Sequence, residues 1–168
     1  MRISVSRMVF LIVEMSVLAF ILTSTSSLPE YVASNFNGAG EPNSYMSRSN
    51  YSVFILVFAV GIPCLVMGGI SIGLRSGRRS INIPHKEFWL SPENAPETIR
   101  YLNVHLAYLS SLIALFIGYV HWLVMQANSV QPAQLSNSHL FTGMGLMFIG
   151  ILLWVVLLII RFGKVPNP

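Results

Sequence analysis

Residues 102–126 read LNVHLAYLSSLIALFIGYVHWLVMQ and contain no charged side chain. A helix needs about 20 apolar residues to cross the hydrocarbon core of a bilayer, so this stretch is long enough to span a membrane. Four small residues recur at spacings that place them on one helical face: Ala107, Ser111, Ala114 and Gly118. Bulkier residues lie on the opposite side: Tyr101, His105, Leu112, Phe116 and Tyr119. Because small residues let membrane helices approach closely, the stretch predicts a spanning helix with one packing face.

Three other stretches have a similar length and apolarity, at about 8–25, 51–74 and 139–161. Of the 168 residues, 54% are hydrophobic and 10% are charged, whereas ordinary soluble domains have about 25% charged residues. A water-soluble enzyme and an isolated nucleic-acid-binding domain are therefore excluded. We expect an all-α fold, a single integral membrane domain built as a four-helix bundle in the lipid bilayer. Its connections are residues 26–50, 75–101 and 127–138.

Glycines in two other spans add possible packing faces: Gly61, Gly68, Gly69 and Gly73 in the second, and Gly143 and Gly150 in the fourth. These faces serve either the bundle itself or contact with a protein partner or a second copy of the chain.

The basic residues predict the orientation. Nine of the ten lie at the two termini and in the connection 75–101, and Arg48 is the exception. Basic loops stay on the cytoplasmic side of a membrane, so we expect both termini and residues 75–101 to be cytoplasmic. The connections 26–50 and 127–138 are then outside. The first span has two interpretations, a retained helix or a cleaved signal peptide. Glu14 within the apolar run and the length of that run favour the retained helix.

Glu14 and His105 are the candidate polar pair inside the membrane. Each enters its span from the cytoplasmic side by a similar number of residues, so a contact between them is open. A carboxylate at membrane depth must be paired, protonated or hydrated, and it is a candidate for proton handling. The alternative is a structural hydrogen bond. His121 and His139 lie near the outer ends of their spans, without the further ligands that a metal site needs.

The outer connection 26–50 carries a motif, LPEYVASNFNGAGEPNSYMS from Leu28 to Ser47. It resembles the membrane domain of unknown function at the N-terminus of bacterial SdpI-type toxin-immunity proteins, over about residues 8–74. The matching positions are Leu28, Pro29, Val32, Phe36, Asn37, Gly40, Pro42, Asn43, Tyr45 and Ser47. Asn35 replaces the histidine that this family has before Phe-Asn, so a role tied to that histidine does not carry over.

The resemblance implies a non-catalytic recognition or protective protein of the bacterial inner membrane. We find no catalytic motif, and we expect no cofactor and no metal. Two alternatives stay open. One is an accessory subunit of a larger membrane complex, and the other is a small proton-coupled transporter that uses Glu14 and His105.

Overall fold

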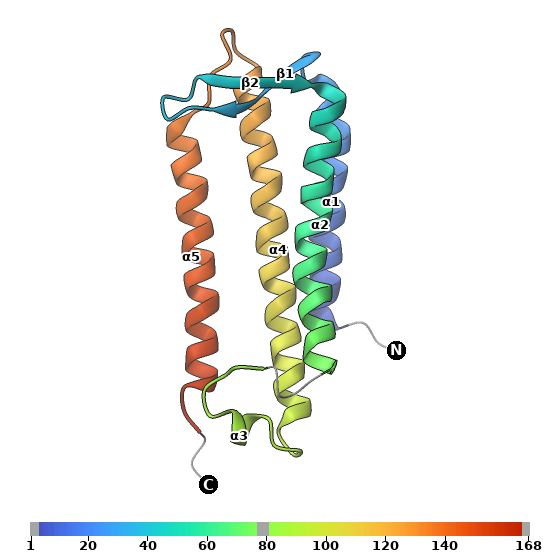
Figure 1. Cartoon of the computed structure of the whole chain (residues 1–168), viewed down its shortest axis with the longest axis vertical. Helices are drawn as coiled ribbons and strands as arrows, with labels where there is room; N and C mark the ends of the chain where they lie inside the picture. The colour runs from blue at the N-terminus through green and yellow to red at the C-terminus, as the bar shows by residue number, and fades with distance from the viewer. Residues whose placement is uncertain (1–3, 77–80, 166–168) are drawn as a thin grey trace.

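The computed structural model describes residues 4–76 and 81–165, of which 69–76 are described by their backbone alone. Within these ranges the elements follow in the order α1 (Val5–Ser24), the 3-10 turn η1 (Thr25–Ser27), β1 (Tyr31–Phe36), β2 (Pro42–Ser47), α2 (Arg48–Ser76), α3 (Lys86–Trp89), α4 (Ala95–Asn128) and α5 (Asn137–Phe162). Figure 1 shows four long helices side by side, with the β-hairpin across one end and α3 at the other. We call these the hairpin end and the α3 end.

Four helices in the described part of the chain are long and apolar enough to cross a membrane: Val5–Ser27, Arg48–Gly68, Ala95–Asn128 and Asn137–Phe162. The predicted all-α membrane bundle is therefore confirmed. The helix α4 begins at Ala95, ahead of the apolar span that starts at about 102, with a proline in its first turn. Proline is tolerated there because its missing N–H would be unpaired in any case. Four of the basic residues that predicted the orientation are outside what the structure describes in side-chain detail: Arg2, Arg75, Arg78 and Arg79.

The central helix is α4, and α1, α2 and α5 all pack against it. Its predicted small-residue face is buried, and a Cβ added to Gly118 would lie 3.3 Å from Val17 Cγ1 of α1. The opposite face meets α5, where Gly143 lies against the ring of Tyr119 and Gly150 against Leu112. Small residues thus mediate both contacts, as the sequence predicted.

The four helices are not equally embedded. In the apolar part of α5, 6% of the residues are buried, compared with 39% in α4. Three helices, α1, α2 and α4, form the core, and α5 lies on the flank of α4. The glycines Gly61 and Gly68 of α2 have no neighbouring atom within 4 Å of an added Cβ, so they do not pack inside this bundle. The pair Gly69 and Gly73 falls in the stretch described by its backbone alone.

The α3 end is closed by contacts between α3, α4 and α5. Arg161 of α5 forms an ion pair with Glu97 of α4 at 3.0 Å and lies over the ring of Trp89, 4.8 Å from its centroid. The Trp89 ring is buried edge-on against Phe162. This cluster holds the end of α5 to the start of α4.

The main feature that the sequence did not predict is the two-stranded antiparallel sheet within residues 26–50. Its register runs from Tyr31 opposite Ser47 to Phe36 opposite Pro42, with irregularities on both sides of Asn35. Leu28 and Val32 are buried in one apolar cluster with side chains of α1, α2 and α4. The hairpin is therefore part of the core and not a flexible connector.

Replacing Gly118 by leucine should destabilise the bundle, because the added side chain would push α1 away from α4. Overpacking of this kind costs about 1–3 kcal/mol. The measurement is thermal unfolding of the purified protein in detergent. The matched control is Gly145→Leu in α5, where an added Cβ meets nothing within 4 Å. Equal stability of the two variants would contradict the packing of α1 on this face.

Candidate functional site

The tip of the hairpin is built by Asn37. Its side-chain Oδ1 accepts hydrogen bonds from the backbone N–H groups of Ala39 and Glu41, both at 2.9 Å. Its carbonyl accepts a bond from Gly40 N–H at 2.9 Å. Gly40 has φ 84°, a left-handed conformation that favours glycine, and an added Cβ there would collide with the carbonyl of Leu135. The Asn-x-x-Gly part of the motif is thus explained by the geometry of a tight turn.

The connection between α4 and α5 holds the tip from the other side. Leu135 N–H donates to Gly40 O at 2.9 Å, and Gln134 Nε2 donates to Ala39 O at 2.9 Å. Asn137 Nδ2, at the start of α5, donates to Gly38 O at 3.0 Å. Figure 1 shows the hairpin reaching across the end of the bundle toward α5. The two connections at the hairpin end therefore form one hydrogen-bonded unit.

Asn128, the last residue of α4, holds the middle of β1. Its Oδ1 accepts from Ala33 N–H at 2.8 Å, and its Nδ2 donates to Ala33 O at 3.0 Å. These two bonds satisfy the outward-facing backbone groups of β1 at the irregularity beside Asn35. The amide takes the place of a neighbouring strand, so this edge of the sheet is covered.

The rest of the motif divides into buried and exposed positions. Leu28 is buried, and Pro29 O accepts a bond from Arg48 Nε at 3.3 Å. Phe36 and Pro42 are half-buried partners at the end of the register. Tyr45, in contrast, is 56% exposed, and Tyr31 is 64% exposed. Most of the motif therefore maintains the hairpin, while the two tyrosines are free to contact another molecule.

Asn35 stands at the position where the resembling family has histidine. It is exposed, and the strand register is irregular on both of its sides. The side chain at this position is on the surface of the hairpin, so its replacement leaves the core unchanged.

A buried polar cluster lies beneath the hairpin and joins the three core helices. His121 of α4 is fully buried. Its Nδ1 is 2.9 Å from the hydroxyl of Tyr51 in α2, and its Nε2 is 2.9 Å from Ser24 Oγ in α1. The Tyr51 ring also stacks on the imidazole, and Phe20 meets it edge-on. The sequence analysis placed His121 near the outer end of its span but did not predict these partners.

The Ser24 hydroxyl also donates to the carbonyl of Phe20. The donor and acceptor roles of the two imidazole nitrogens depend on the tautomer of His121. In either tautomer, one imidazole connects α1, α2 and α4.

Glu14 and His105 are both buried, but the structure does not bring them into a hydrogen bond. Both carboxylate oxygens of Glu14 and Nδ1 of His105 have no hydrogen-bond partner. Glu14 lies on the face of α1 that packs on α4, whereas His105 stacks on Tyr101 and lies beside Trp154 of α5. The contact that the sequence left open is absent, because Glu14 packs against one face of α4 and the His105 side chain lies on the opposite face.

Depth separates them as well. Val17 lies against Gly118, which puts Glu14 at about the level of Ala114. His105 is nine residues before Ala114, or about 14 Å along the helix.

His121 and His139 do not form a metal site. His139 is exposed, with its ring edge-on to Trp122, while His121 is fully buried. Within residues 4–76 and 81–165 there is no group of three or more side chains suited to hold a metal ion.

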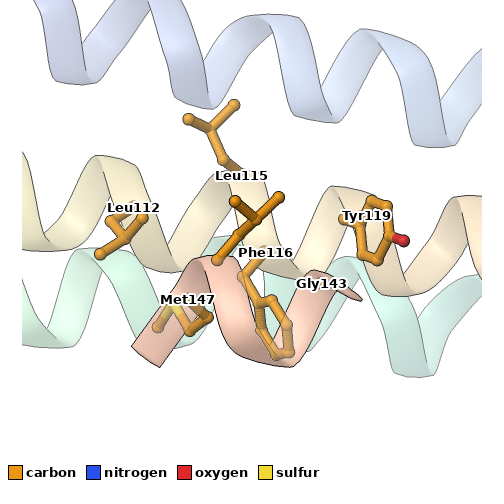
Figure 2. A pocket seen from close by; sticks show the side chains of 7 residues that line it. Leu112, Leu115, Phe116, Tyr119, Gly143 and Met147 are labelled. Carbon is orange, nitrogen blue, oxygen red and sulfur yellow. The ribbon is translucent and has the colours of Figure 1, made fainter. Parts of the chain in front are cut away.

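A groove separates α4 from α5 in the middle of the bundle (Figure 2). It has a volume of about 310 Å³, and it is lined by Leu112, Leu115, Phe116, Tyr119, Gly143, Leu146 and Met147. The Tyr119 hydroxyl already donates to His139 O at 2.7 Å. Apart from this hydroxyl and the Met147 thioether, the lining offers hydrocarbon contacts.

Comparison with known proteins finds a similarity to one family model in the first part of the chain. Residues 11–60 match the family model described as a domain of unknown function, DUF1648. The match covers most of α1, the whole hairpin and the first part of α2, including every position of the motif. Comparisons with curated proteins and with solved structures gave no match. The finding supports a membrane domain of unknown function in the first part of the chain.

Replacing His121 by phenylalanine should destabilise the protein by about 1–3 kcal/mol, because Tyr51 would keep a buried hydroxyl without a partner. Adding Tyr51→Phe should recover part of this loss, since both polar partners are then removed. Thermal unfolding of the single and double variants measures the coupling. His139→Phe, at an exposed histidine, is the control. Additive losses would show that the cluster is not a connected unit.

Proposed function

We propose that this chain is a non-catalytic multi-pass protein of the bacterial inner membrane that recognises an envelope factor through its hairpin. The role is protective, as in the SdpI-type proteins that the motif resembles. The observation that carries the proposal is the combination of a rigidly held hairpin with two exposed tyrosines, Tyr31 and Tyr45. Exposed aromatic side chains on a fixed backbone bind partners at a low cost in conformational entropy.

Three contacts support a rigid recognition surface. Asn128 holds the middle of β1, the 129–136 connection holds the tip, and Arg48 holds the base through Pro29 O. A surface that is ordered before binding loses less entropy when its partner docks. Glu30 and Glu41 are exposed near the tyrosines, so the hairpin end also has acidic groups.

A second candidate, an accessory subunit of a larger membrane complex, is favoured by one observation. The apolar part of α5 is 6% buried, and the α4–α5 groove opens beside it. In such a complex, a helix of the partner subunit would pack along α5. The functional test below separates the two candidates.

The proposed orientation puts the hairpin end outside and the α3 end in the cytoplasm, because five described basic residues lie toward the α3 end: Arg7, Lys86, Arg100, Arg161 and Lys164. Topology reporters fused after Asn43 and after Ala133 should report an external location, and a reporter fused after Asn82 should report a cytoplasmic one. An external signal at Asn82 would contradict the orientation.

The recognition function is tested in a strain that lacks the chain. Wild-type protein should restore survival against at least one membrane-active peptide or envelope-stress agent in a panel. The double variant Tyr31→Ala/Tyr45→Ala should lose this protection, with a loss of about 1–2 kcal/mol of binding free energy per tyrosine. Tyr108→Ala is the matched control, because Tyr108 is 50% exposed on α4 and far from the hairpin.

Normal membrane levels of every variant are checked by immunoblot. Full protection by the double variant would overturn recognition through the hairpin and favour the accessory role of α5. Absence of protection by the wild-type protein across the panel would contradict the protective function itself.

A further inference from the structure

Glu14 is a buried carboxyl group in the interior of the three-helix core. It lies on the same face of α1 as Phe10, Val17 and Ile21, and it is 6% exposed. It is nine residues after the first residue of α1, or about 14 Å along the helix axis. The candidate span Val5–Ser27 has 23 residues, so Glu14 is close to its middle. An ionisable group at this depth is a functional-site candidate by default.

Two neighbouring helices leave polar groups unpaired in this region. Both oxygens of Glu14 and the hydroxyl of Ser110 in α4 have no hydrogen-bond partner, and Ser110 is fully buried. Buried polar groups in proteins are nearly always paired, so each exception calls for an explanation such as a bound water or ion. Two unpaired groups in the same interior indicate a bound water or ion more strongly than either group does alone.

The register of α1 and α4 places these groups near one another. The contact of Val17 with Gly118 fixes the register. Counting back along both helices, Ser110 is about 7.5 Å closer to the α3 end than Glu14. Both side chains lean toward the α3 end, because helical side chains point toward the N-terminus of their helix and the two helices run in the same direction. The two groups therefore share one part of the interior without a direct hydrogen bond. Ser110 is eleven residues before His121, or three turns, so both lie on the face of α4 that meets α1 and α2.

No charge compensates Glu14 among the described side chains packed around it. The α4 face against α1 consists of Ala107, Ser111, Ala114 and Gly118, none of which titrates. From α2, the thiol of Cys64 is near enough to interact electrostatically with the carboxyl. On α1 itself the nearest charged residue is Arg7, seven residues away. An ionised carboxylate here would be both desolvated and unpaired, which is energetically costly.

We propose that Glu14 and Ser110 form a reversible proton-binding site in the interior of the bundle. The Glu14 carboxyl group carries a proton in the closed bundle. When water reaches the site, the O–H bond breaks, and the proton passes to water as hydronium. The carboxylate that remains accepts hydrogen bonds from water, and the Ser110 hydroxyl is a second polar group that binds this water. The site does not involve the hairpin surface, so the test of this proposal is independent of the test of the recognition function.

The test uses infrared difference spectroscopy of the full chain reconstituted in phosphatidylcholine vesicles. Wild-type protein should show the C=O stretch of a protonated carboxyl group that disappears on alkalinisation and returns on acidification. Transfer to D2O should shift the band, because water that reaches the site exchanges the proton. Glu14→Gln should lack the band and keep the thermal stability of the wild type. Ser110→Ala should move the midpoint of the transition to higher pH, because the water that bonds to the carboxylate loses a binding partner.

Glu30→Gln, at an exposed glutamate, is the matched control and should keep the band. Glu14→Asp serves as a second variant that keeps a carboxyl group if the glutamine variant does not fold. A band that survives in Glu14→Gln, or the absence of a reversible band in wild-type protein, would overturn the proposal. An unshifted midpoint in Ser110→Ala would remove Ser110 from the site.

Discussion

The imidazole of His121 is the interaction on which the core depends, because it bonds to two other helices at once. Tyr51 comes from α2 and Ser24 from α1, and each bonds to a different ring nitrogen. The apolar contacts between membrane helices resemble the contacts that the same side chains make with lipid, so they specify little by themselves. A buried imidazole with two fixed partners has no equivalent in lipid. It therefore determines how α1, α2 and α4 are placed relative to one another at the hairpin end.

The hairpin uses this placement. Leu28 and Val32 pack into the apolar cluster next to the histidine, and Asn128 extends the same helix far enough to bond both backbone groups of Ala33. One helix, α4, thus supplies both the histidine at the centre of the core and the asparagine that holds the hairpin. A displacement of α4 would therefore move the hairpin and its exposed tyrosines, because the apolar cluster and Asn128 both connect the hairpin to α4.

The spanning helices and their small-residue packing faces could be predicted from the sequence. Each depends only on composition or on the periodicity of a single helix. Gly118 and Gly143 were placed correctly on packing faces by spacing alone. The hairpin was missed because its strands lack a regular alternation. Positions 32 and 33 are both buried, and the register is irregular beside Asn35. The partners of His121 could not be predicted, since they come from two other helices, and no local sequence pattern determines how these helices are placed relative to α4. The contact between Glu14 and His105, which the sequence left open, is absent because His105 lies on the other face of α4 and about 14 Å closer to the α3 end.

The segment that matches a known family, residues 11–60, contributes Tyr51 and Ser24 but neither His121 nor Asn128. During synthesis, α1, the hairpin and α2 leave the ribosome before α4 does, and at that stage the Tyr51 hydroxyl and the backbone of Ala33 lack their native partners. The segment therefore lacks the two α4 side chains, His121 and Asn128, that complete these hydrogen bonds. In this chain, the buried polar cluster and the hold on the hairpin are therefore completed only when α4 packs against the first two helices.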